Sequence, residues 1–280
     1  MKLVRYGEAG TEKPGLIDGS GQLRDLSAHI ADLDAAAYES ASLERLKRID
    51  PASLPAVAGS PRLGPPISRT GHFIAIGLNY ADHAREAGLP IPAEPLVFSK
   101  APSSLSGPND DIVYPRGASK LDWEVELALI IAKRAWQVSE DDALDCVAGY
   151  TVCNDVSERA WQIDGTGQWI KGKSAPTFGP LGPVLVTRDE IADPQNLDLF
   201  LDVNGERHQT GNTSTMIFPV TTLISYLSTI MLLEPGDVIT TGTPPGVGMG
   251  MKPQKFLKPG DEVRLGIAGI GEQTQKVVAE

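Results

Sequence analysis

The chain of 280 residues carries 25 Lys and Arg against 36 Asp and Glu, and the net charge of −11 argues against binding to nucleic acid or to anionic membranes. No apolar run approaches the roughly 20 residues of a membrane helix, and the N-terminus lacks the apolar segment of a secretory signal. Cys146 and Cys153 are too few for a disulfide framework, so we expect a cytoplasmic protein.

The first 66 residues predict a small N-terminal domain. Residues 2–7 and 15–26 have the composition of short strands, and the second group turns at residues 18–21. A helix is expected over residues 36–48, and the Pro-, Gly-, Ser- and Ala-rich residues 51–66 have the composition of a linker. We therefore place a second, larger domain at residues 67–280.

Strand patterns outnumber helical ones in this larger domain. Helices are expected at residues 80–87, 157–163 and 218–229, and Pro-Gly-Asp at residues 235–237 and 259–261 predicts two type II turns. Because strands and helices do not alternate regularly, an α+β fold with a mostly β core is favoured over a Rossmann fold. Runs typical of strands lie at residues 72–78, 96–100, 121–133, 148–155, 182–187, 197–205, 236–242 and 261–267.

Two glutamates stand out in the apolar sequence LDWEVELALIIAK of residues 121–133. Alternation along a strand places Glu124 and Glu126 on the same face, which is also the pattern of an edge strand facing water. The rest of the segment is apolar on both faces, which favours a buried strand with the two acids at its end. Asp155 follows the strand sequence GYTVCN of residues 149–154, where it can be a helix cap or turn residue, a third acid of the same site, or both. Three carboxylates without a soft ligand suit a hard cation, Mg²⁺ first, with Mn²⁺ or Ca²⁺ as alternatives.

Two other segments carry candidate catalytic side chains. His83 and Glu86 are spaced i, i+3, so on a helix the carboxylate can orient the imidazole for activating a water, although surface pairs of this kind are common. Lys171 and Lys173 share a face if their segment is extended, near an anionic ligand or simply in solvent. The Gly- and Pro-rich loop TTGTPPGVGMG does not match a nucleotide-binding motif; its amides and Thr243 are candidates for holding a carboxylate.

From about residue 72 to the C-terminus the motifs resemble those of the fumarylacetoacetate hydrolase family, in the family's order. The resemblance implies a mixed β-roll domain, a homodimer, and Mg²⁺ or Mn²⁺ held by Glu124, Glu126 and Asp155. The sequences that carry it are GLNYADHAREAG, LVFSK, DWEVELALII, VCNDVSERAWQ, QWIKGKSAPTFGPLGP, DVNGE, ISYLSTIMLLEPGDVITTGTPPGVG and LKPGDEV.

The resemblance also assigns roles to residues outside the acid triad. In relatives that cleave acylpyruvates, the helix matching His83 and Glu86 is a lid whose pair activates water, and the lysine matching Lys173 stabilises an enolate. Lys100, Gln162 and Thr243 match positions that contact substrate.

The resemblance implies hydrolysis of the C3–C4 bond of a 2,4-diketo acid. The expected substrate is 2,4-diketo-3-deoxy-L-rhamnonate, which would give pyruvate and L-lactate. The same metal site would also serve a 2-hydroxyhepta-2,4-diene-1,7-dioate isomerase, a 2-keto acid hydratase, an oxaloacetate decarboxylase or a ureidoglycolate lyase-like enzyme. A non-catalytic β-domain that binds a divalent metal or a carbohydrate is the alternative from a different class.

Overall fold

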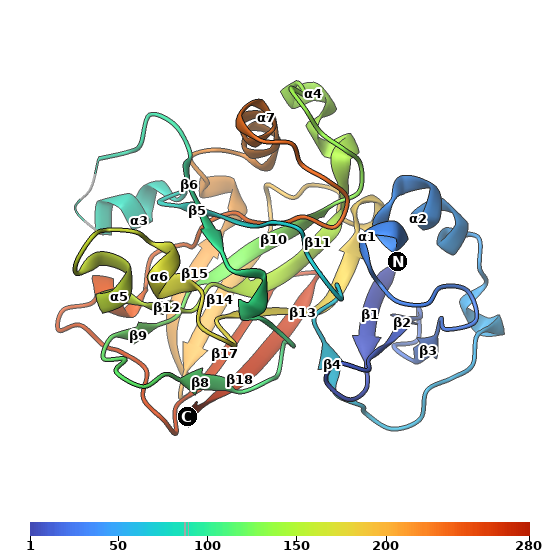
Figure 1. The fold of residues 1–280 in the computed structure, drawn as a ribbon, viewed down its shortest axis with the longest axis horizontal. Coiled ribbons are helices and arrows are strands. Elements are labelled where there is room, and N and C mark those ends of the chain that lie inside the picture. Colours follow the sequence, from blue (N-terminus) through green and yellow to red (C-terminus); the bar gives the residue numbers. More distant parts are fainter. Residues whose placement is uncertain (87, 89) are drawn as a thin grey trace.

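The computed structural model describes residues 1–86, 88 and 90–280, and its architecture is built around one large mixed sheet (Figure 1). The sheet has the strand order β3-β2-β1-β13-β11-β10-β16-β5-β6, and β4 pairs with β1 while β7 pairs with β13. Its strands are β1 (Lys2–Tyr6), β2 (Lys13–Ile17), β3 (Leu23–Asp25), β4 (Leu63–Gly64), β5 (Phe73–Gly77), β6 (Leu96–Lys100), β7 (Leu105–Ser106), β10 (Val125–Ile131), β11 (Val147–Asn154), β13 (Gly179–Thr187) and β16 (Val238–Thr240).

A second sheet packs against the first, in the order β15-β14-β17-β18-β8, and a small separate pair joins β12 to β9. The strand-rich α+β fold expected from the sequence is confirmed. The strands of these two sheets are β8 (Ile112–Tyr114), β9 (Leu121–Asp122), β12 (Ser157–Glu158), β14 (Asp198–Val203), β15 (Glu206–Asn212), β17 (Glu262–Ile267) and β18 (Gly271–Ala279).

The helices are short and lie around the sheets (Figure 1). None in the described part of the chain is long and apolar enough to cross a membrane. Their bounds are α1 (Ala35–Tyr38), α2 (Ser40–Lys47), α3 (Ala81–Glu86), α4 (Glu140–Ala143), α5 (Arg159–Ile163), α6 (Ile170–Lys173) and α7 (Val220–Ile230).

Strand β10 lies at the centre of the large sheet between β11 and β16, and all seven of its residues are buried. Leu127 and Leu129 point into a core shared with the second sheet and α7, whereas Ala128 and Ile130 point into a core shared with α1 and α2. The sequence expectation of a strand buried on both faces is confirmed. Glu126 belongs to the same face as Ala128 because alternate side chains share a face.

The N-terminal residues extend the large sheet. Strand β1 pairs antiparallel with β13, with Leu3 opposite Leu185. The single helix expected over residues 36–48 is instead two, because Glu39 has extended backbone angles (φ −56°, ψ 140°) between α1 and α2. The division at residue 66 remains a prediction.

The two turns and the long helix predicted from the sequence are present in the structure. Gly236 and Gly260 have φ of +87° and +100°, and Asp237 N and Asp261 N donate to the carbonyls three residues earlier, as the two Pro-Gly-Asp turns predict. Helix α7 agrees with the expected span to within two residues.

Two other local expectations need adjustment. The helix expected from residue 157 begins at Arg159, because residues 157–158 pair with β9 and the Glu158 carboxylate caps α5 by accepting from Trp161 N. The helix expected over residues 80–87 is α3; residue 87 lies outside the described residues.

Candidate metal centre and active site

The three predicted acids meet where β10 and β11 lie side by side. Val125 is in register with Asn154, and Asp155 N donates to Glu124 O at 2.9 Å, so the antiparallel pairing brings Asp155 back beside the two glutamates. One carboxylate oxygen from each of Glu124, Glu126 and Asp155 lies within 4.8 Å of the other two. All three side chains are buried, so alternation on β10 and the register of β11 together create the cluster.

Lys173 and Arg159 compensate two of these acids. Lys173 Nζ lies 2.7 Å from both Glu124 Oε2 and Asp155 Oδ2, and Arg159 Nη2 donates to Glu124 Oε1 at 2.6 Å. Burial alone would raise the pKa of Glu124, but the charges of Arg159 and Lys173 outweigh it and hold that pKa well below its usual range. Glu124 is therefore ionised at neutral pH inside the protein.

Glu126 is the exception in the cluster. Its Oε2 accepts from Gly242 N at 3.0 Å, and among the described residues no ion pair reaches it. Burial, followed by repulsion from Asp155 and Glu124, raises its pKa well above the ordinary value of 4.5. A buried acid without a cationic partner is the feature that a bound cation would neutralise.

The donor set fits a hard divalent cation. The buried cluster contains four carboxylates (Asp122, Glu124, Glu126 and Asp155) and three cations (Lys100, Arg159 and Lys173), which leaves one negative charge in excess if all are ionised. Each carboxylate oxygen has a second lone pair, so hydrogen bonding to lysine or arginine does not prevent coordination. Oxygen ligands without thiolate or imidazole suit Mg²⁺, Mn²⁺ or Ca²⁺.

The predicted histidine pair forms on α3. His83 Nδ1 lies 3.1 Å from Glu86 Oε2, and the same carboxylate accepts from Gly246 N at 3.1 and 3.2 Å. Because the carboxylate is the acceptor, Nδ1 carries the hydrogen and Nε2 keeps its lone pair for taking a proton. Glu86 thus orients His83 and attaches α3 to the Gly- and Pro-rich loop.

A cavity of about 100 Å³ joins most of the predicted residues. His83, Glu124, Glu126, Gln162, Lys173 and Thr243 all line it.

Lys100, Thr243 and Lys171 have surroundings that the sequence did not predict, and contact of Lys100 and Thr243 with substrate remains a prediction. Lys100 lies behind Asp155, where Nζ contacts Asp155 Oδ1 at 2.5 Å and the Lys173 carbonyl at 2.6 Å. The Thr243 hydroxyl donates to Val125 O and accepts from Gln209, so its hydrogen is committed inside the protein. Lys171 does not share a face with Lys173, because the segment is the helix α6, with Lys171 exposed and Lys173 buried.

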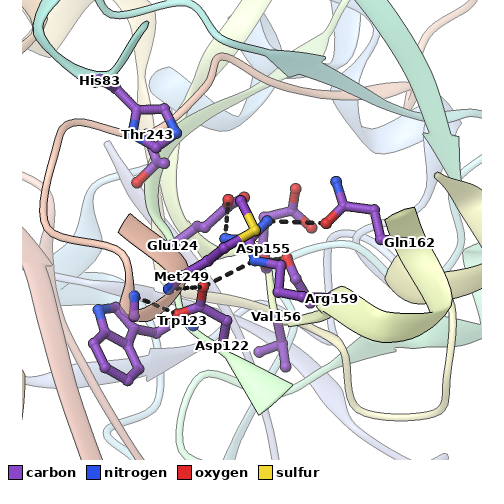
Figure 2. A network of polar contacts seen from close by, with 12 residues as sticks. His83, Asp122, Trp123, Glu124, Asp155, Val156, Arg159, Gln162, Thr243 and Met249 are labelled. Atoms are coloured by element: carbon purple, nitrogen blue, oxygen red, sulfur yellow. Dashed lines mark hydrogen bonds and ion pairs between the residues drawn. The ribbon is translucent and has the colours of Figure 1, made fainter. Parts of the chain in front are cut away.

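Asp122 and Arg159 are site residues that sequence reasoning missed. Arg159 Nε donates to Asp122 Oδ2 at 2.8 Å while its Nη2 holds Glu124, so the guanidinium joins the two acids (Figure 2). Asp122 also accepts from Gly248 N at 2.7 Å and from Met249 N at 3.0 Å. A signal existed in the sequence: Asp122 precedes Glu124 by two residues and extends the acidic pattern to D-x-E-x-E.

Asp122→Asn is expected to destabilise the protein by about 3 kcal/mol, because an amide cannot accept from all four donors and leaves Arg159 partly unpaired in a buried site. Urea unfolding measures this loss. Asp82→Asn, in an exposed pair with Arg85, is the matched control and should change stability by less than about 1 kcal/mol. Equal effects of the two substitutions would contradict the role of Asp122.

Comparison with known proteins identifies the family. Residues 72–278 match the family profile described as "Fumarylacetoacetate (FAA) hydrolase C-terminal". The chain belongs to the fumarylacetoacetate hydrolase family. The family membership inferred from the sequence motifs is therefore confirmed, and a Burkholderia ambifaria protein named "Putative hydrolase" is 62% identical over 98% of each chain.

Solved structures of this family share the whole fold. Maleylpyruvate hydrolase from Sphingobium sp. SYK-6, solved with manganese(II) ion and pyruvate, is 28% identical with a TM-score of 0.82, covering 100% of this chain and 99% of its own. A 5-carboxymethyl-2-hydroxymuconate delta-isomerase from Mycobacterium smegmatis is 31% identical with a TM-score of 0.78, covering 100% of both chains. This fumarylacetoacetate hydrolase family member is therefore an enzyme of a fold that serves both hydrolases and isomerases.

Proposed function

We propose that the enzyme hydrolyses the C3–C4 bond of a 2,4-diketo acid and releases pyruvate. The first substrate to test is 2,4-diketo-3-deoxy-L-rhamnonate, which would give pyruvate and L-lactate. The observation that carries the proposal is one cavity lined both by the buried acids Glu124 and Glu126 and by the oriented base His83. A homodimer and a cytoplasmic location remain predictions.

Glu124, Glu126 and Asp155 are the residues that would hold the divalent cation. When bound, Mg²⁺ or Mn²⁺ supplies Lewis-acid stabilisation of the negative charge that develops on a 2-oxo acid. The pyruvate and manganese(II) in the structure of the Sphingobium relative support this assignment. Mg²⁺ remains the first choice because the donors are all carboxylate oxygens.

The side chains of this protein account for the proton transfers. His83 Nε2 takes a proton from water, and the hydroxide formed adds to the C4 carbonyl carbon. As the C3–C4 bond breaks, C4 leaves as a carboxylic acid and the electron pair of the bond passes into the 2-oxo group to give an enolate. C3 of the enolate then takes back from the His83 imidazolium the proton that came from water, which gives pyruvate. The positive charge of Lys173, held at the cavity by Glu124 and Asp155, stabilises this developing anion. Glu86 keeps the imidazole in the required tautomer.

An isomerase is the second candidate, favoured by the shared fold of the Mycobacterium smegmatis delta-isomerase. Isomerisation moves a proton within the substrate and consumes no water, so it would release no pyruvate. The pairing of His83 with Glu86, in which Nε2 has no hydrogen-bond partner among the described residues, favours the hydrolytic reaction.

Pyruvate release tests the proposal. The purified protein with Mg²⁺ should release pyruvate from 2,4-diketo acids, measured by coupling to lactate dehydrogenase, and EDTA should abolish the rate until Mg²⁺ or Mn²⁺ is restored in excess. Release that persists in EDTA would refute the metal centre. Absence of pyruvate from every 2,4-diketo acid, with double-bond migration in an unsaturated dioate, would identify an isomerase instead.

A further inference from the structure

The cavity has two chemically different halves. The acids and cations described above form one half, and six apolar side chains form the other: Ile76, Leu78, Phe98, Ile163, Trp169 and Met249. We refer to these six as the apolar wall. They come from β5 and the residue after it, from β6, from α5, from the residue before α6 and from the 3-10 turn at residues 248–250, so five segments of the chain converge to build it.

Phe98 marks the boundary between the two halves. Lys173 Nζ lies 5.1 Å from the centroid of the Phe98 ring, and the same ring packs edge-on against Trp169, with centroids 5.2 Å apart and planes at 62°. The ammonium group that contacts Glu124 and Asp155 therefore also touches the first ring of the apolar wall. If the 2-oxo acid group of a substrate binds at the acids, the side of the cavity at Phe98 and Trp169 is the space left for its acyl substituent.

The Trp169 ring packs closely against β5 at Gly77. A Cβ added at Gly77 would lie 2.5 Å from Trp169, so the absence of a side chain at this position lets the indole lie against the strand. Such a contact restricts the ring and makes it a defined surface. Rigid aromatic walls of this kind recognise apolar groups.

The apolar wall contains no charged side chain. The two cations that line the cavity, Arg159 and Lys173, are already paired with Glu124. Among the described residues, its remaining polar side chains besides the acids are His83, Gln162 and Thr243, and neither of the last two is charged. A carboxylate at the far end of a substrate would lose its water there without gaining a cation. A hydrocarbon group would gain from the same burial.

We propose that the enzyme acts on acylpyruvates whose acyl substituent is a hydrocarbon, bound against the apolar wall. This inference rests on the proposed function, since it names the substrate class of that reaction. It ranks alkyl substituents above hydroxylated ones and both above carboxylate-terminated ones. Ile163, 46% exposed and adjacent to Gln162 on α5, is the wall residue at the cavity's solvent side.

A substrate series tests the ranking. Lengthening 2,4-dioxohexanoate to 2,4-dioxooctanoate should raise kcat/KM about fourfold for each methylene that reaches the wall, the equivalent of ~0.8 kcal/mol. 2,4-Dioxohexanoate differs from 2,4-diketo-3-deoxy-L-rhamnonate by one hydroxyl at C5 and should be cleaved the faster of the two. Fumarylpyruvate, which ends in a carboxylate, should be the poorest. A preference for fumarylpyruvate over 2,4-dioxooctanoate would overturn the inference.

A substitution in the wall supplies the matched test. Ile163→Lys places a cation at the solvent side of the cavity. It should raise kcat/KM for fumarylpyruvate by up to about fivefold and lower kcat/KM for 2,4-dioxooctanoate. Ile163→Leu keeps the apolar surface and should preserve the wild-type ranking. An unchanged ranking in Ile163→Lys would show that the substituent binds elsewhere.

A binding measurement tests the apolar subsite independently of the proposed hydrolysis. Calorimetric titration with 2-oxobutanoate, 2-oxohexanoate and 2-oxooctanoate in Mg²⁺ measures affinity without cleavage, and Kd should fall as the chain lengthens. If no 2,4-diketo acid yields pyruvate but Kd still falls with length, the proposed function fails and the apolar subsite stands. Pyruvate release with no effect of chain length on kcat/KM or Kd would sustain the reaction and refute the subsite.

Discussion

Glu126→Gln is expected to abolish divalent-cation binding and reduce turnover by on the order of a thousandfold or more, because several kcal/mol of charge stabilisation depend on the cation. The amide oxygen can still accept from Gly242 N, so the local hydrogen bond is preserved. Removing a carboxylate that Asp155 and Glu124 repel should leave the cation-free protein at least as stable as wild type. Pyruvate release, Mn²⁺ titration and urea unfolding in EDTA measure the three effects.

Glu124→Gln is the informative comparison because it removes a carboxylate that is ion-paired, whereas Glu126 has no ion pair among the described residues. Glu124 pairs with both Arg159 and Lys173, so its loss leaves two buried cations short of a partner and should destabilise the protein by about 3 kcal/mol. Both variants should lose activity, but only this one should lose stability in EDTA. Wild-type Mn²⁺ affinity in Glu126→Gln would refute its assignment as a ligand.

The raised pKa of Glu126 also predicts a pH dependence. Above the ordinary value of 4.5 the unfolded chain releases this proton, whereas the folded, cation-free protein retains it until its raised pKa is reached. The stability of the chelated wild type should therefore fall as pH rises through that window. Glu126→Gln lacks the titrating group, so the difference between the two urea midpoints, followed against pH in EDTA, isolates this contribution. A difference that does not vary with pH would contradict it.

His83→Ala is expected to lower kcat by about 10²- to 10⁴-fold, the usual contribution of a positioned general base. Cation affinity and KM should be nearly unchanged, because His83 contacts Glu86 rather than the acid cluster. Steady-state kinetics with a 2,4-diketo acid and a Mn²⁺ titration provide the measurements.

The matched control for His83→Ala is His72→Ala. His72 pairs with Asp237 and has a side chain that is 53% exposed, outside the cavity. Its removal should leave kcat unaltered. Glu86→Gln should fall between the two histidine variants, because it weakens the orientation of the imidazole without removing the base. A near wild-type kcat in His83→Ala would exclude its role in activating water.

The clustering of Glu124, Glu126 and Asp155 could be predicted because it depends on alternation within one strand and on pairing with the next strand. Alternation puts Glu124 and Glu126 on one face whatever surrounds them, and the apolar run around them indicates burial. Asp155 directly follows β11, the next strand along the sequence from β10, and two consecutive strands commonly pair. The i, i+3 spacing of His83 and Glu86 likewise needs only one turn of helix.

Tertiary packing decided which charges meet. Lys173 reaches Glu124 across 49 positions of the sequence, Arg159 reaches Asp122 across 37, and the loop amide of Gly248 reaches Asp122 across 126. No local rule distinguishes Lys173, which enters the cluster, from Lys171, which faces solvent.

The difference between the two glutamates has the same origin. In the sequence they are equivalent acids on one face of a strand, whereas in the folded protein Glu124 lies against two cations and Glu126 against a backbone amide. Side-chain alternation depends on the geometry of neighbouring peptide units, so it can be read from a few residues. The pKa of a buried acid depends on distances to charges carried by remote segments, and those distances exist only once the sheets and helices have packed.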